Sequence, residues 1–233
     1  MKEIHQTAVA ELESLAGTGN RDQSSASYTG SQHFFYAVPV PKRREIIKAL
    51  IKNREAKELL TLAEALFKGS SHEEKTMGAM ILTYRKDVRQ FCDFSTLDNW
   101  LGELVGWAEI DAFCYNTFSV DEILFDFKPW KQFICALAHD SNINKRRAAL
   151  VFLTHPTAKS SDERLHALAF KLILQLASEK DILLTKAISW LLRSQIDTRK
   201  EAVAEFIKIH ESKLPKIALR ETRRKLVTGK KNK

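Results

Sequence analysis

The stretch PWKQFICALAHDSNINKRRAALVFLT, residues 129–154, contains the pattern that decides the fold. Apolar residues recur at three- and four-residue spacing over residues 129–139 and again over 143–154, which is the period of an amphipathic helix. The polar segment between them, residues 138–142, is short and suits the connection between two antiparallel helices. The stretch therefore predicts one helix pair.

The same helical period covers almost the whole chain, and little of the chain alternates as a β-strand does. Eight glycines and five prolines are too few for a turn-rich β protein. Short polar breaks, such as residues 178–181, separate the helices into pairs at a spacing of roughly 35 to 45 residues, as in HEAT or armadillo repeats. We therefore predict an all-α fold, an α-solenoid of antiparallel HEAT/ARM-like helix pairs. The expected helices span residues 2–16, 41–53, 55–68, 72–86, 96–104, 107–118, 120–126, 129–139, 143–154, 162–178, 181–195, 199–211 and 215–227.

Local signals add detail to this outline. Ser71, followed three residues later by Glu74, predicts a capping box at the start of the helix over 72–86. Residues 17–27 predict a loop by their composition. We expect residues 1–228 to form a single HEAT-like repeat domain with a concave binding face, and residues 229–233 to form a disordered basic tail.

The net charge of +8 is concentrated at one end of the sequence. Residues 213–233 contain nine basic residues and one acidic residue, while the first 212 residues contain 28 of each kind. A basic terminus is more often a solvated end than a nucleic-acid site. The basic clusters Lys42–Arg44 and Lys145–Arg147 are more suggestive, because cationic side chains at helix starts bind backbone phosphates.

Several classes of chemistry lack their motifs. The sequence contains no phosphate loop, no dinucleotide fingerprint, no His-Glu-x-x-His pair and no serine-hydrolase elbow. Cys92, Cys114 and Cys135 are an odd number without Cys-x-x-Cys spacing, which argues against a disulfide framework and a zinc site. We expect no metal and no cofactor. No run of about 18 apolar residues and no signal segment occurs, so we expect no membrane association and a cytoplasmic location.

The segment around Trp107 and Asp111 is the best clue to function. The two residues are four positions apart, so an indole and a carboxylate share one helix face. Trp107 alone is most often a packing residue, and Asp111 alone is as readily the partner of an Arg. Arg147 is a candidate for that partner, or for a phosphate contact. Trp190 has a packing context by default, with Arg193 nearly one turn later.

Four motifs in order make the chain resemble the HEAT-like-repeat alkylpurine DNA glycosylases of the AlkD type. The resemblance covers most of the chain and implies a right-handed curved superhelix. The motifs are Tyr28 with the aromatic stretch Phe34–Arg44, the pair Trp107 and Asp111, Arg147 followed by Ala148–Leu150, and Lys186–Arg193 around Trp190. Ala37 stands where the family usually has Gly, which predicts altered backbone geometry. Gly106 replaces an aromatic residue found in some members, which predicts a thinner wall at the site.

The resemblance also implies an activity and a set of site residues. The activity is hydrolysis of the N-glycosidic bond of cationic N3- or N7-alkylated purines in double-stranded DNA, by a monomer associated in use with the nucleoid, leaving an abasic site without metal or cofactor. The alternative is a non-catalytic HEAT-repeat relative that binds DNA structures or acts as a protein scaffold. The implied catalytic residues are Asp111, Trp107 and Trp190, and the implied DNA-binding residues are Arg147, Arg193, Tyr28, Arg146 and Lys145.

Overall fold

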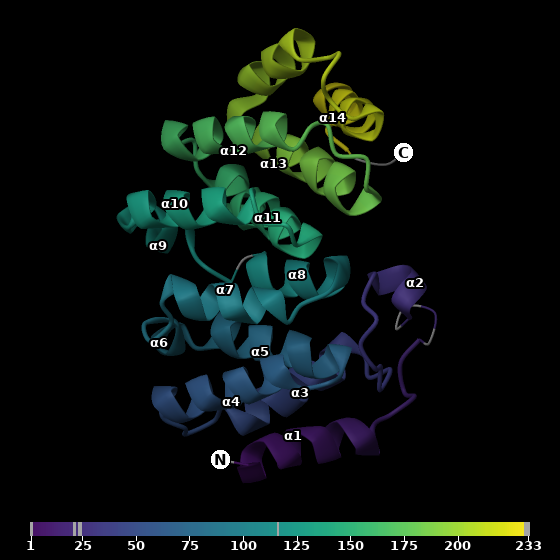
Figure 1. Cartoon of the computed structure of the whole chain (residues 1–233), viewed down its shortest axis with the longest axis vertical. Helices are drawn as coiled ribbons and strands as arrows, with labels where there is room; N and C mark the ends of the chain where they lie inside the picture. Colours follow the sequence, from purple (N-terminus) through teal and green to yellow (C-terminus); the bar gives the residue numbers. More distant parts are fainter. Residues whose placement is uncertain (1, 21, 23–24, 116, 231–233) are drawn as a thin grey trace. The chain divides into compact units, whose positions relative to one another are not determined.

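The computed structural model describes residues 2–20, 22, 25–115 and 117–230 (Figure 1). Within these residues it contains 14 helices and no β-strand, with 73% of the chain in helices, so the predicted all-α class is confirmed. None of the helices described has the length and apolar character needed to cross a membrane. The helices are α1 (Lys2–Ser14), α2 (Ala26–Thr29), α3 (Val40–Leu50), α4 (Ala56–Lys68), α5 (His72–Tyr84), α6 (Lys86–Arg89), α7 (Phe94–Gly102), α8 (Gly106–Cys114), α9 (Val120–Phe125), α10 (Phe127–Leu137), α11 (Ile143–Lys159), α12 (Glu163–Gln175), α13 (Ile182–Ile209) and α14 (Lys216–Thr228).

The chain forms two compact units, Met1–Phe113 and Cys114–Lys233, here called unit 1 and unit 2. In unit 1, α5 packs against α3 and α4, and α1 packs against α3 and α4. The predicted capping box is confirmed, since Ser71 and Glu74 satisfy each other's backbone amides at the start of α5. Inside the unit, Phe67 of α4 stacks on Trp100 of α7, with ring centroids 4.7 Å apart. The ring of Phe67 also meets Phe113 of α8 edge-on, so one aromatic cluster fixes α8 to the core.

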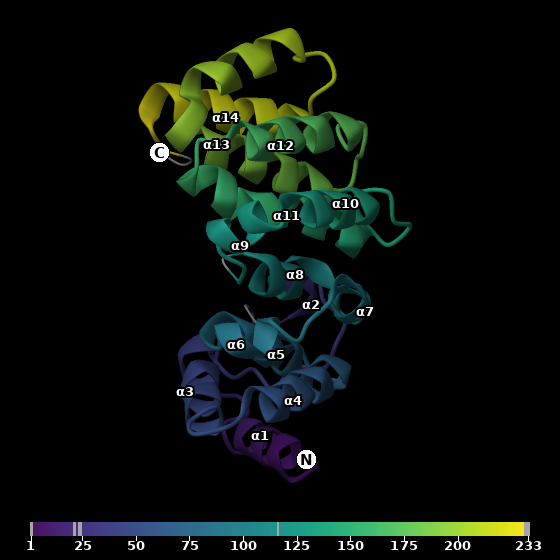
Figure 2. The same cartoon turned by 90° about the vertical axis from the view of Figure 1, so that its left-hand side faces the viewer.

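Unit 2 is organised around α11 and α13, which pack directly against each other (Figure 2). Residues 148–153 of α11 are fully buried, because α9, α10 and α12 also pack on this helix. Four aromatic rings fill the space beside α11, and α14 packs against α13. These rings belong to Phe118, Trp130, Phe133 and Phe152.

Several helix ends differ from the predicted ones. The helix expected over 107–118 ends at Cys114, and α11 continues past Pro156 to Lys159. Proline removes one backbone hydrogen bond, yet the last turn of α11 is bonded to α13. The Oγ1 of Thr157 lies 3.0 Å from the hydroxyl of Ser194, and Thr198 donates to the carbonyl of Thr157. These contacts fix the last turn of α11 to α13, although Pro156 donates no backbone hydrogen bond.

Other differences are smaller. The helices expected over 181–195 and 199–211 form α13, which is interrupted by non-helical backbone at Arg199. The four-residue helices α2 and α6 were not expected, because so short a segment has no readable period. Parts of three predictions lie outside the described residues: Arg21, Gln23 and Ser24 of the loop, Asn116 of the helix over 107–118, and residues 231–233 of the tail.

Ala37 adopts a left-handed backbone conformation of the kind that favours glycine. Its φ is +57°, in the left-handed region, and the residue is buried. The turn is held from both sides. The amide of Gly19 donates to the Ala37 carbonyl at 2.7 Å, and the buried carboxylate of Glu73 accepts from the amides of Tyr36 and Val38. The surroundings therefore impose a conformation that disfavours a Cβ atom.

Ala37→Gly should stabilise the protein. Relief of the left-handed strain, about 1–2 kcal/mol, exceeds the extra chain entropy of glycine, about 0.5–1 kcal/mol. The expected net gain is therefore about 0.5–1 kcal/mol, measured by urea denaturation. Ala10→Gly, on an exposed position of α1, is the matched control and should destabilise by about 1 kcal/mol. A loss of stability in both variants would contradict the strain argument.

Candidate functional site

Helix α8 presents Trp107 and Asp111 on one face, as predicted from their spacing. Both side chains are partly exposed, while Ile110 and Phe113 of the same helix are fully buried. The helix is thus anchored by its apolar positions and keeps the indole and the carboxylate at the surface of unit 1. An aromatic face beside a carboxylate is suited to a cationic group.

The indole of Trp107 is held by the segment of α2. Its Nε1 donates to the backbone carbonyl of Tyr28 at 2.5 Å. The ring of Tyr28 lies edge-on to the indole, with centroids 5.3 Å apart and an interplanar angle of 74°. Tyr28 itself is 51% exposed. The structure therefore brings together two predicted site residues that are 79 positions apart in the sequence.

Two glycines make this contact possible. Gly30 and Gly106 both have positive φ, +73° and +79°, and their backbones touch. A Cβ on Gly106 would lie 2.3 Å from the carbonyl carbon of Gly30 and 2.5 Å from the carbonyl oxygen of Thr29. The wall expected to be thinner at Gly106 is therefore filled by backbone, and glycine is required because nothing larger fits.

Glu109 holds the segment after α2 against α8, a role that sequence reasoning missed. Its buried carboxylate accepts a hydrogen bond from the hydroxyl of Ser31 at 2.6 Å and from the amide of Val105 at 2.9 Å. The Nδ1 atoms of His33 and His72 each lie 3.1 Å from it. An ionised carboxylate only accepts, so both imidazoles must carry a proton on Nδ1. The network ties α8 to the start of α5 and to the loop after Tyr28.

The environment of Glu109 strongly favours its ionised form. Burial alone would raise the pKa of this carboxyl, but the hydrogen bonds from His33, His72, Ser31 and the Val105 amide outweigh burial and lower the pKa to about 2. The carboxylate therefore stays charged in the folded protein at any ordinary pH. It is inaccessible, so its contribution is to hold the surface residues in place.

In unit 2, Trp190 lies in an aromatic cluster at the surface. The ring of Tyr115, which is 43% exposed, packs on the partly exposed indole with centroids 5.1 Å apart and planes at 36°. The ring of His155 meets Tyr115 edge-on at 5.7 Å. The Nδ1 of His155 is buried without a hydrogen-bond partner, and burial, helped by Lys159, lowers the pKa of this imidazole. Tyr115 and His155 were not predicted, since neither belongs to a recognisable motif.

Arg147, near the start of α11, is buried rather than extended into solvent. Only 5% of the residue is exposed, and its Nη1 donates to the backbone carbonyl of Leu183 at 2.6 Å. The guanidinium thus joins α11 to the first turn of α13. A guanidinium has five N–H donors, so the bond to Leu183 does not use all of them. The role of Arg147 in binding phosphate stays a prediction.

The other two predicted basic residues also contact their own unit. Lys145 lies 3.6 Å from the carboxylate of Asp140. Arg146 donates to the carbonyls of Asp140 and Ser141 and lies 3.0 Å from the carboxylate of Glu179. These contacts hold the connecting segment between α10 and α11 in place. They give the basic residues a structural role that does not require a ligand.

Arg193 is bonded to α14. Its Nε lies 3.3 Å from the hydroxyl of Ser189 and 3.4 Å from the carboxylate of Glu221. Burial lowers the pKa of this guanidinium, and the negative charge of Glu221 opposes that change. Arg193 therefore sits in a partly buried polar cluster one turn from Trp190.

The predicted site residues divide between the two units. Unit 1 contains Tyr28, Trp107 and Asp111, and unit 2 contains the rest. The convergence of both sets on one concave face stays a prediction.

Comparisons with known proteins agree on one family. The sequence profile of the family described as DNA alkylation repair enzyme matches residues 8–226. No curated protein sequence matches the chain at a significant level. Among solved structures, the chain resembles a predicted DNA alkylation repair enzyme from Enterococcus faecalis, with a TM-score of 0.73 and 21% identity. The match covers 90% of this chain and 97% of the other, so the predicted α-solenoid-like fold class is confirmed.

Gly106→Ala should displace the Tyr28 segment from Trp107. The added Cβ has no room and the backbone is left-handed, so we expect a loss of about 2–3 kcal/mol in a urea titration. Gly229→Ala is the control, because Gly229 has a similar φ of +72° but nothing within 4 Å of its Cβ position. The control measures backbone strain alone. Equal effects of the two changes would show that the close approach of Gly30 is unimportant.

Glu109 should make unit 1 sensitive to acid. Because the folded pKa lies below the ordinary 4.5, its contribution is present above about pH 4.5 and is lost as pH falls toward 2. That contribution is worth about 3 kcal/mol. Glu109→Gln should lose it at pH 7 and show a flatter stability profile between pH 5 and 3. Glu11→Gln, an exposed change in α1, should leave the profile of the wild type. An unchanged acid profile in Glu109→Gln would refute this account.

Proposed function

The chain belongs to the DNA alkylation repair enzyme family, and we propose that within DNA repair it acts as a monofunctional alkylpurine DNA glycosylase. Its substrate would be duplex DNA that carries cationic N3- or N7-alkylated purines, and its products the free base and an abasic site. The observation that carries this proposal is the face of α8, where the indole of Trp107, fixed by the Tyr28 carbonyl, lies one turn from the Asp111 carboxylate.

The substrate needs little help to lose its base. Alkylation at N3 or N7 gives the purine a formal positive charge, which makes it a good leaving group. As the glycosidic bond lengthens, positive charge develops on the deoxyribose. A fixed carboxylate beside the sugar then stabilises the transition state more than the ground state, which is the requirement for catalysis. We assign this role to Asp111, which would also orient the attacking water.

The two indoles would act on the same charge. Electron-rich rings attract cations by about 0.5–2 kcal/mol each, depending on desolvation. Trp107 is restrained by Tyr28, and Trp190 by the ring of Tyr115, so neither indole would need to be ordered on binding. Preorganised rings of this kind contact the sugar and the cationic nucleotide without extruding the base into a deep pocket.

The remaining predicted residues would hold the DNA backbone. Tyr28 is exposed beside Trp107, Lys145, Arg146 and Arg147 lie in the first turns of α11, and Arg193 lies near the middle of α13. Their contacts within unit 2 fix the positions of these charges, and their remaining donors would bind phosphates. Water is the second substrate, and the proposed chemistry uses neither metal nor cofactor.

Asp111→Asn tests the chemical role of the carboxylate. The substitution keeps the shape of the side chain but removes its charge, so single-turnover release of 7-methylguanine from methylated duplex DNA should fall by about 10²-fold, or some 3 kcal/mol. Affinity for DNA should be unchanged or higher, because a negative charge near phosphates is removed. Asp121→Asn, at an exposed position of α9, is the control and should excise at the wild-type rate.

The structural alternative for Asp111 makes the opposite prediction. If the carboxylate only stabilises the fold, Asp111→Asn should lower the melting temperature while excision per folded molecule stays at the wild-type value. A wild-type protein that binds duplex DNA but releases no alkylated base would favour the non-catalytic DNA-binding alternative.

A further inference from the structure

The excess positive charge of the chain has a definite location in the structure. Five of the seven basic residues described in residues 213–230 lie on α14, where the side chains of Lys216, Arg220, Arg223 and Arg224 are exposed. We call these four residues the basic face of α14. None of them belongs to the candidate site described above.

The two remaining charged residues of α14 point elsewhere. The carboxylate of Glu221, the only acidic residue after position 212, accepts a hydrogen bond from Ser189 at 2.6 Å and lies beside Arg193. The Nζ of Lys225 donates to Asp197 and to the backbone carbonyl of Arg193. The one acidic residue of α14 is therefore used for packing against α13, and it does not offset the charge of the basic face.

The basic face is continuous along the helix. At 3.6 residues per turn, its four residues fall within an arc of about 100° around the helix axis. Lys216, Arg220 and Arg224 follow one another at four-residue intervals, about 6 Å apart along the axis. Like charges at this spacing destabilise a helix. The positive end of the helix dipole, next to Lys216, adds to the repulsion.

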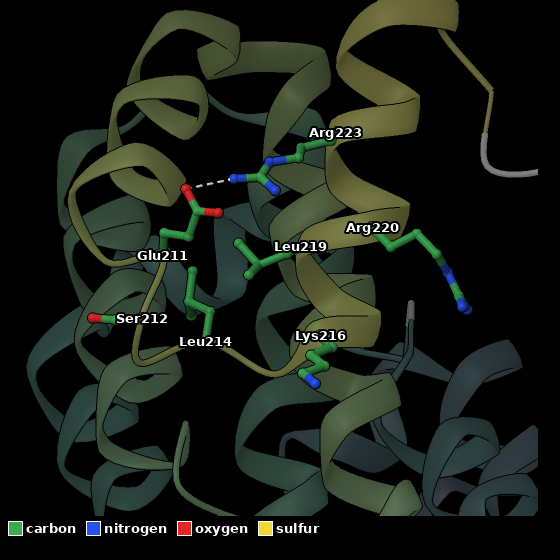
Figure 3. Close-up of a pocket in the computed structure, with 7 residues that line it drawn as sticks. All are labelled: Glu211, Ser212, Leu214, Lys216, Leu219, Arg220 and Arg223. Carbon is green, nitrogen blue, oxygen red and sulfur yellow. Dashed lines mark ion pairs between the residues drawn. The ribbon is translucent and has the colours of Figure 1, made fainter.

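Little within unit 2 compensates for these charges. Arg223 pairs with Glu211 at 2.7 Å, as Figure 3 shows. Among the residues that the structure describes, Lys216, Arg220 and Arg224 form no ion pair. Figure 3 also shows Arg220 extending away from the pair of Glu211 and Arg223. Beside Lys216 and Arg223, an open hollow of about 670 Å³ lies over Leu214 and Leu219.

We propose that the basic face of α14 is a second DNA-binding surface, which binds the phosphates of the duplex outside the reaction site and without regard to the lesion. This inference rests on the proposed function, because it takes duplex DNA as the ligand. A polyanion with regularly spaced charges complements a row of cations that repel one another. Helix α14 itself lies beside the unit 2 part of the candidate site, since Glu221 contacts Arg193, which is one turn from Trp190.

The surface would bind DNA of any sequence. Lysine and arginine on phosphates position a duplex without specifying its sequence. Such interactions would hold undamaged DNA while the protein searches for a lesion, and they would weaken as salt increases.

The test is the salt dependence of binding to an undamaged duplex, measured by fluorescence anisotropy. In the triple variant Lys216→Gln, Arg220→Gln and Arg224→Gln, the slope of log affinity against log salt should become shallower by about 2 to 3, at about 0.9 for each phosphate that the variant no longer neutralises. Affinity near 0.1 M salt should fall by about 10-fold or more. The melting temperature should not fall, because repulsion along α14 is relieved.

Two control variants isolate the position of the charges. The first control is a triple variant that removes the same charge from exposed positions of α10 and α12: Lys128→Gln, Lys131→Gln and Lys171→Gln. This variant should keep the wild-type slope. The second control keeps the charge on α14 by exchanging one cation for another: Lys216→Arg, Arg220→Lys and Arg224→Lys. This variant should also keep the wild-type slope. An unchanged slope in the glutamine variant of α14, or an equal change of slope in both glutamine variants, would overturn the inference.

The outcome is separable from that of the proposed function. Release of 7-methylguanine by the wild-type protein is measured on the same preparation. If the wild type excises the base and the slope of the α14 variant is unchanged, only the inference fails. If the wild type binds duplex DNA through α14 but releases no base, the inference stands and the proposed activity fails.

Discussion

A single ionised carboxylate inside unit 1 determines how the surface of α8 is built. The partners of Glu109 come from segments 78, 76 and 37 residues away in the sequence. A buried charge is costly unless its hydrogen-bond acceptor positions are filled. If any one of these segments moved away, the buried carboxylate would lose a donor and the fold would be destabilised. The segment after α2 is therefore held in place by an acid that never reaches the surface, and the position of Tyr28 over Trp107 depends on it.

The two exposed indoles are restrained by related means. Trp107 is fixed by a backbone carbonyl and the ring edge of Tyr28, an arrangement that requires the paired glycines beneath it. Trp190 is covered on one side by the ring of Tyr115. In each unit a tyrosine orders a tryptophan at the surface and leaves part of the indole accessible. Rings held this way lose little freedom when a ligand arrives, so more of the interaction energy remains for binding.

The sequence predicts those features that depend on near neighbours along the chain. The helix pairs, the capping box at Ser71 and the shared face of Trp107 and Asp111 all follow from spacings of three or four residues. The role of Glu109 does not, because its partners are distant in sequence. The burial of Arg147 is hidden for a similar reason, since it depends on which side of α11 meets α13. Continuation of α11 past Pro156 likewise depends on bonds to another helix.

The placement of Glu221 has an effect on how molecules meet. Because this acid is turned toward α13 and the cations of α14 toward solvent, the positive charge of α14 faces outward from one side of unit 2. A polyanion at a distance exerts a torque on such a body and rotates it before any contact forms. The screening length at physiological ionic strength is about 8 Å, so this alignment operates only over the last few water layers. Orientation would therefore be decided during the approach, and collisions with the wrong side of unit 2 would become rarer.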